Sequence, residues 1–215
     1  MVGVLGVSAS AILVRFSQAP SGVTAAYRLG WTVLLLLPVV LLRCRAELRR
    51  VTARDLVLCG ASGVLLALHF LTWFESLKRT SVASSTVLVS TEVIFTALGF
   101  ALFLHGKIPR LGVWAILLAF GGSALLALSG GGGAGELSSN LLALAAASAA
   151  AVYTLIGRIQ RGHLSTTVYT FLTYLACFLT LLLGTAAAGT PLTGYGGREW
   201  LIGLALAVLC TLLGH

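Results

Sequence analysis

The sequence predicts an all-α polytopic membrane protein, and three observations support this fold class. The 215 residues are 58% hydrophobic and only 9% charged, with a mean hydropathy of +1.02, whereas ordinary soluble domains carry roughly a quarter charged residues. Apolar runs of about 20 residues recur along the chain, and in lipid only helices and closed barrels satisfy every backbone polar group. Because the runs do not alternate with a period of two, membrane-spanning helices are favoured over barrel strands.

Turn-forming segments divide the apolar runs into eight expected helices. The first run lacks a basic N-terminal region and ends at Arg15, which favours a first spanning helix over a cleaved signal peptide. Turns are expected at Pro20, around Gly106 and in the glycine run 130–133, which opens a flexible linker over residues 130–138. The expected helices cover residues 2–16, 23–42, 55–76, 81–104, 110–129, 139–157, 164–184 and 199–215.

Positive charge predicts how these helices are oriented. The loops after the second, fourth and sixth helices hold nine Lys and Arg residues, whereas those after the third, fifth and seventh hold three. Arg15 and Arg28 flank the first loop and raise the second set to five, and we interpret Arg28 as an interfacial side chain near the outer surface. The positive-inside rule therefore places the N-terminus in the cytoplasm. The net charge of +8 then reflects topology, and no aromatic–basic motif for nucleic acid accompanies it.

The chain also repeats itself at an interval near 143 residues. Three matched pairs share this interval: Arg15 with Arg158 after 143 residues, Tyr27 with Tyr169 after 142, and His69 with His215 after 146. Five helices precede the second copy, and because an odd number of crossings reverses direction, the second copy is expected to be inverted. Inverted repeats are typical of secondary transporters, whose substrate site lies between the copies. We therefore expect a first repeat at 1–129, the linker at 130–138 and a C-terminally incomplete second repeat at 139–215.

Glu92 is the clearest candidate for chemistry, because ionisable side chains inside membrane spans are costly. It lies midway along the expected helix 81–104, on one helical face with Ser84, Ser85 and further small polar residues. We interpret Glu92 as a proton-coupling or cation-binding carboxylate. The alternative is a protonated or hydrogen-bonded structural glutamate.

His69 is the second candidate inside a span. It shares a face of the expected helix 55–76 with Ser62, Trp73 and Ser76. It could bind substrate or relay a proton. The alternative is a structural histidine that forms a hydrogen bond to a neighbouring helix. We favour this alternative, because His69 is alone in its span.

One enzyme-like pattern competes with transport. Residues 60–63, Gly-Ala-Ser-Gly, match the GxSG pattern of rhomboid intramembrane proteases, in which a histidine on another helix activates the serine. His69 lies two turns along the same helix, about 10 Å away by rise, so it cannot be the base for Ser62. The sequence contains no phosphate-binding loop and no clustered metal ligands. We therefore expect no catalytic residue, no metal and no cofactor.

Residues 73–89 resemble the signature of helices 3 and 4 in EamA-type transporters of the drug/metabolite transporter superfamily, and Thr-Ser-Val-Ala-Ser-Ser at 80–85 is the most specific part. Residues 8–15 with Tyr27 and Arg28 resemble the family's helix 1–2 pattern. The resemblance implies ten helices in two inverted five-helix repeats, about eight of them present here, with both termini in the cytoplasm. It also implies a central cavity lined by helices 1, 3, 4, 6, 8 and 9. The candidates for substrate contact are then His69, Trp73, Ser84, Ser85 and Glu92.

We therefore expect a secondary transporter that exports or exchanges small metabolites, amino acids or drugs across the cytoplasmic membrane of a bacterium, with proton coupling at Glu92. The expected partners are a small-molecule substrate and the lipid bilayer, and nucleic acid is not expected. A homodimer is a further possibility. The alternative class is a non-transporting membrane protein: a degenerate relative, a subunit that pairs with another chain, or a rhomboid-like protease. Family members often carry proline where Glu92 stands, and a glutamate that closes helix 4 where this chain has His105-Gly106-Lys107, so no role at these positions is carried over from the family.

Overall fold

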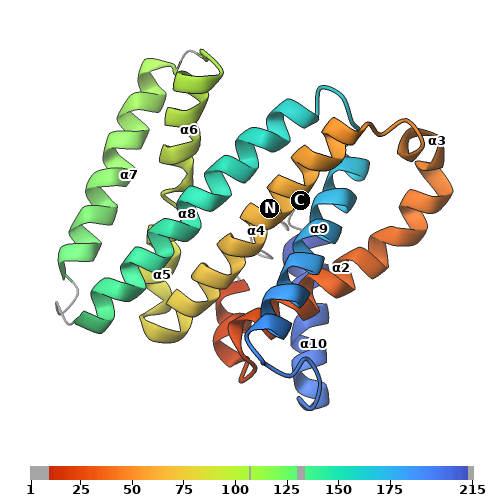
Figure 1. Cartoon of the computed structure of the whole chain (residues 1–215). Helices are drawn as coiled ribbons and strands as arrows, with labels where there is room; N and C mark the ends of the chain where they lie inside the picture. Colours follow the sequence, from red (N-terminus) through yellow and green to blue (C-terminus); the bar gives the residue numbers. More distant parts are fainter. Residues whose placement is uncertain (1–9, 107, 130–133, 213–215) are drawn as a thin grey trace.

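The computed structural model describes residues 10–106, 108–129 and 134–212, and every regular element in these ranges is a helix (Figure 1). Five segments of the described residues are long and apolar enough to cross a membrane, four of them single helices and the fifth, Val82–Phe103, formed by α5 and α6 together, which confirms the all-α polytopic membrane fold. The elements are a helix over residues 10–16, α2 (Ser21–Arg43), α3 (Arg45–Leu48), α4 (Ala53–Arg79), α5 (Val82–Val89), α6 (Glu92–Phe103), α7 (Arg110–Ser129), α8 (Ala134–Gln160), α9 (Thr166–Ala187), α10 (Gly197–Ala205) and a π-helix, Leu206–Leu212.

The expected helices lie within a few residues of the observed ones, with three differences. The expected helix 199–215 is α10 followed by the π-helix. The expected linker 130–138 is too long, because α8 already begins at Ala134. The expected helix 81–104 is divided into α5 and α6. Residues 2–9 of the first expected helix, the glycine run 130–133 and His215 lie outside the described residues.

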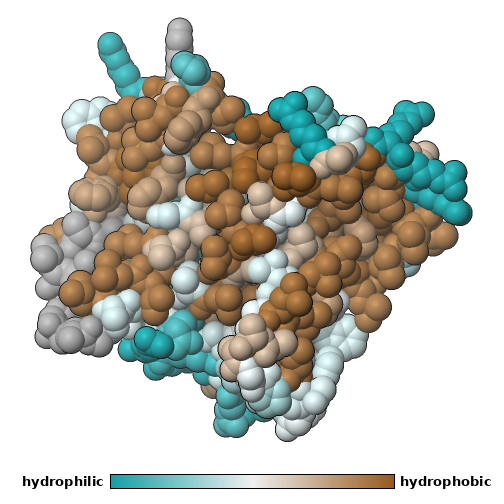
Figure 2. Space-filling view, in the orientation of Figure 1, coloured by the Kyte–Doolittle hydropathy of each residue, from teal (hydrophilic) through white to brown (hydrophobic). Residues whose placement is uncertain are grey.

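The surface of the bundle is apolar where a soluble protein would be polar. Figure 2 shows a broad hydrophobic belt between hydrophilic ends. Large side chains on it are almost fully exposed, including Leu42 at 84%, Leu111 at 81% and Leu118 at 81%. Such a belt is the surface that the hydrocarbon core of a bilayer covers.

Helix α4 lies at the centre of the bundle and packs against α8 and α9. Its first turn is fixed by a capping box, in which the Thr52 side chain accepts from the Asp55 N–H and the Asp55 carboxylate accepts from the Thr52 N–H. Further along, Phe70 and Phe74 fill the main core, 6% and 0% exposed. Helix α2 packs against α9 and α10 on the other side.

The turns alternate between the two ends of the bundle. The α2–α4 connection, which contains α3, lies at the same end as the α6–α7 and α8–α9 turns (Figure 1). The α4–α5 turn and the α9–α10 connection lie at the opposite end. This is the alternation that successive membrane crossings require, and the arginine-rich segment 43–54 belongs to the first end.

The break between α5 and α6 falls near the middle of a span that covers Val82–Phe103. Ser90 and Thr91 form a tighter turn there, and the Thr91 N–H donates to the carbonyl of Leu88, three residues back, at 3.2 Å. The two hydroxyls bond to preceding backbone, with Ser90 Oγ donating to the Thr86 carbonyl at 2.7 Å and Thr91 Oγ1 to that of Leu88 at 2.6 Å. Serine and threonine hydroxyls that bond back in this way bend helices.

Candidate functional site

A cavity of about 340 Å³ lies where the helices of the two halves of the chain meet. Its walls come from the helix over 10–16 and from α2, α4, α5, α6, α8, α9 and the π-helix. The volume is within the range of sites for small ligands, roughly 300–1,000 Å³. The lining residues are Ser10, Arg28, Leu66, His69, Phe70, Trp73, Thr86, Val89, Ser90, Glu92, Val93, Ala150, Tyr153, Thr154, Tyr174 and Cys210.

Glu92 reaches this cavity from the break in the span. It is the first residue of α6, where the positive end of the helix dipole favours a negative side chain. In the part of the chain that the structure describes, its carboxylate has no ion pair and no hydrogen bond. A carboxylate that lines a cavity without a protein partner is available to a proton or to a cationic group of a ligand.

His69 and Trp73 lie on the cavity wall one helical turn apart on α4. The Nδ1–H of His69 donates to the backbone carbonyl of Ala146 at 3.0 Å, since a carbonyl can only accept. The neutral ring therefore keeps Nε2 as an acceptor. The Trp73 Nε1–H is buried and has no hydrogen-bond partner among the described residues. A buried unsatisfied N–H is costly, so a ligand that accepts from Trp73 would gain binding energy.

Ser84 and Ser85 are placed away from the cavity wall. The Ser84 hydroxyl donates to Oδ1 of Asn140 at 3.3 Å and joins α5 to α8. Ser85 accepts from the Ser76 hydroxyl at 2.9 Å and joins α5 to α4. Both serines are buried, and these hydrogen bonds position the walls of the cavity rather than its contents.

Arg28 differs most from the sequence-based interpretation. It is only 6% exposed, so the expectation of an interfacial arginine that reaches toward the outer surface is wrong. Helix α2 begins at Ser21, which places Arg28 two turns, about 10 Å, into the span. Thr24 and Thr32 lie one turn on either side of Arg28 and are equally buried. This polar stripe at a helical period was the signal in the sequence that could have identified a buried arginine.

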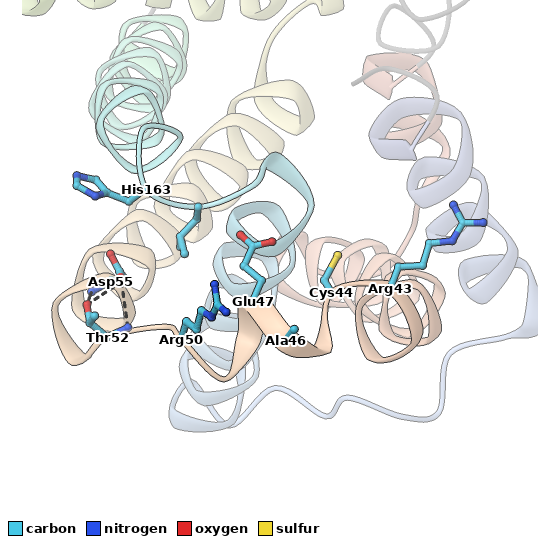
Figure 3. A pocket seen from close by; sticks show the side chains of 9 residues that line it. Arg43, Cys44, Ala46, Glu47, Arg50, Thr52, Asp55 and His163 are labelled. Carbon is cyan, nitrogen blue, oxygen red and sulfur yellow. Dashed lines mark hydrogen bonds between the residues drawn. The ribbon is translucent and has the colours of Figure 1, made fainter.

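A second, larger hollow of about 600 Å³ lies at the arginine-rich end, between the α2–α4 connection and the α8–α9 turn (Figure 3). Its carboxylates already have structural partners. Asp55 bonds to Thr52 and accepts from Gln160 Nε2 at 3.1 Å, and Glu47 accepts from the N–H of Ser165 at 2.6 Å. These bonds connect the two halves of the chain at this end, so the hollow is built by loop contacts.

Ser62 does not have the partner that a protease requires. Its hydroxyl is buried and forms a hydrogen bond of 2.6 Å with the hydroxyl of Tyr169, which joins α4 to α9. Among the described residues no histidine bonds to it, and His69 is held by Ala146 instead. The serine of the Gly-Ala-Ser-Gly segment therefore serves helix packing.

Comparison with known proteins agrees with this arrangement. The family model of the EamA-like transporter family matches residues 1–128, which is more than half of the chain. The chain belongs to the EamA-like transporter family. Members of this family are transporters rather than enzymes, and they belong to the drug/metabolite transporter superfamily. A search of curated proteins gives no match.

Solved structures show the same fold for this EamA-like chain. Sixteen chains match. One of them, described as "Crystal structure of protein", has a TM-score of 0.67 and 19% sequence identity. The match covers 99% of the present chain and 74% of the solved one. At this identity the likeness concerns the fold alone.

Proposed function

We propose that this EamA-like protein is a secondary transporter that exports or exchanges a small metabolite, amino acid or drug across the cytoplasmic membrane of a bacterium. The observation that carries the proposal is the cavity between the two halves of the chain, which is lined by a buried arginine and by a carboxylate that has no partner in the described part of the chain. Ionisable groups inside a membrane bundle mark substrate and ion pathways. A broken helix beside such a site is a recurring element of secondary transporters.

The packing supports two repeats related by a pseudo-twofold axis, with domains at 1–129 and 139–215. Helices α2 and α9 are the second helices of the two repeats, and they pack against each other. Helix α9 also contacts α4, while α2 contacts α10. The α9–α4 contact joins the second helix of the second repeat to the third helix of the first, and the α2–α10 contact joins the second helix of the first repeat to the third helix of the second. A twofold relation between the repeats produces such a matched pair of contacts. The proposed orientation has the N-terminus in the cytoplasm, and the distribution of arginine among the loops supports it.

Glu92 is the group that we assign to proton coupling. Its carboxylate can take up a proton when no cation occupies the cavity. It can release that proton when a substrate binds to the charged form or when the pH gradient across the membrane favours release. Replacement by glutamine keeps the shape and removes the exchangeable proton. Glu92→Gln should therefore abolish substrate efflux driven by a pH gradient while membrane insertion stays normal.

The experiment uses proteoliposomes loaded with a mixture of amino acids and drug-like cations, with efflux measured under an imposed pH gradient. The control variant is Glu75→Gln. It removes a carboxylate outside the cavity that pairs with Arg79 at 2.6 Å on the same helix and accepts from Ser21. Gradient-driven efflux that persists in Glu92→Gln would refute the coupling role. The absence of efflux from the unmodified protein would refute the transport proposal itself.

A further inference from the structure

Arg28 is a buried cation whose charge is neutralised by no side chain of the described residues. All six Asp and Glu residues lie in the described part of the chain, and the ion pair found there joins Glu75 to Arg79. A charge placed in an apolar bundle carries a desolvation cost of several kcal/mol unless a partner offsets it. Ionisable groups inside membrane bundles mark substrate and ion pathways.

The protein holds the guanidinium from three sides without neutralising it. Nε donates to the hydroxyl of Thr211 at 3.0 Å, and Nη1 donates to that of Ser10 at 3.2 Å. The ring of Phe70 lies 4.5 Å from the central carbon of the guanidinium, a cation–π contact that orients the plane. The side chain is thus fixed in place by residues from different helices.

These contacts leave the outer edge of the guanidinium available. Both N–H groups of Nη2 and the second N–H of Nη1 have no acceptor among the described residues. Two parallel N–H groups on neighbouring nitrogens match the two oxygens of a carboxylate. Arg28 is also one of the residues that line the 340 Å³ cavity, so a ligand in the cavity would lie beside its side chain.

The π-helix adds an independent observation at the same place. Thr211 and Cys210 belong to the π-helix Leu206–Leu212, and Cys210 lines the cavity next to Arg28. Short π-helical segments are uncommon and are found frequently at functional sites. Here the wide turn presents Thr211 to the Nε of Arg28.

We propose that Arg28 is the anion-binding group of the substrate site and that the transported molecule carries a carboxylate. This inference rests on the proposed transport function, because it assigns a chemical class to the substrate of the same cavity. The carboxylate lies against the outer edge of the guanidinium, and the aromatic wall formed by Phe70 and Trp73 contacts the apolar body of the molecule. Glu92 lines the same cavity, where its carboxylate binds either a proton or a cationic group of the same molecule.

The test compares matched acids and amides on detergent-solubilised protein, with thermal stabilisation as the readout of binding. The probes are phenylalanine and phenylalaninamide, benzoate and benzamide, and succinate and succinamide, with inorganic phosphate as the alternative oxyanion. We expect at least one acid to stabilise the protein at millimolar concentration while its amide does not. Stabilisation by phosphate alone would overturn the carboxylate assignment, as would equal effects of acids and amides or no effect of any acid.

Variants of Arg28 separate binding from folding. Arg28→Gln should lower the affinity for the acid about 10- to 150-fold, the value of a charged hydrogen-bonded contact, and Arg28→Lys should keep part of it. Without ligand, Arg28→Gln should be at least as heat-stable as the unmodified protein, because it removes an uncompensated charge. Arg158→Gln is the matched control, since Arg158 also lies over a phenylalanine ring, at 4.1 Å from Phe100, but is exposed.

The outcomes distinguish the two proposals. Acid-dependent stabilisation that is unchanged in Arg28→Gln, or a large loss of stability in that variant with acid binding intact, would show a structural arginine and overturn the anion site. If acids bind through Arg28 but do not cross proteoliposomes, the anion site stands and the transport function fails. If amides cross as fast as acids, transport stands and the anion site fails.

Discussion

Gly63 makes a close helix contact, partly against backbone atoms, that allows a quantitative test. A Cβ at this position would lie 2.5 Å from the Cβ of Ala176, 2.7 Å from the backbone N of Cys177 and 2.7 Å from the carbonyl oxygen of Thr173. Two of these atoms are backbone, so no side-chain rotation relieves the clash. Gly63→Ala therefore requires α4 and α9 to separate by about 1 Å, and overpacking of this kind costs about 1–3 kcal/mol.

Gly60 provides the matched control one turn earlier on the same helix, where nothing lies within 4 Å of an added Cβ. Gly60→Ala should stabilise α4 by up to about 1 kcal/mol, because alanine is the better helix former. The two variants should then differ by about 1–4 kcal/mol, or roughly 2–16 °C in unfolding temperature. Thermal unfolding in detergent measures both. A Gly63→Ala protein as stable as Gly60→Ala would refute the close approach of α4 and α9.

Two further predictions concern packing and orientation. The hydrogen bond between Ser62 and Tyr169 should appear as a coupling of about 1 kcal/mol in a double-mutant cycle of Ser62→Ala and Tyr169→Phe, and strictly additive losses would contradict it. Cys44 is partly exposed at the arginine-rich end, so a membrane-impermeant maleimide should modify it in inverted vesicles and not in intact cells. Modification in intact cells would reverse the proposed topology. The remaining cysteines are buried and should stay unmodified in both preparations: Cys59, Cys177 and Cys210.

The spans could be predicted from sequence because lipid imposes one solution on an apolar run. Glu92 could be found for the same reason, since a carboxylate in the middle of such a run is conspicuous. The position of Glu92 at a break in the helix could not be predicted from the sequence. Ser90 and Thr91 are compatible with a continuous helix, and only their hydroxyl bonds to Thr86 and Leu88 show where the helix breaks.

Arg28 shows which information the sequence alone does not contain. Its distance from the start of α2 and the stripe of Thr24 and Thr32 indicate a buried face, but not what lies opposite that face. The partners Ser10 and Thr211 are separated by most of the chain and come together only in the folded bundle. Ser84 and Ser85 show the converse, because a polar stripe that suggests a cavity wall is used for packing against Asn140 and Ser76.

The break at Ser90 and Thr91 also determines which part of the bundle is easiest to displace. Breaking a backbone hydrogen bond in hydrocarbon costs several kcal/mol, so a helix with all its hydrogen bonds resists bending. At this break, hydroxyl groups already bond to the Thr86 and Leu88 carbonyls. Helix α7 packs only against α5 and α6 among the stronger contacts of the described residues. Helix α6 itself packs against α8, so we expect α7 to follow any small bend of α6 at this break, and Glu92, the first residue of α6, to change its exposure to each side of the membrane as it does.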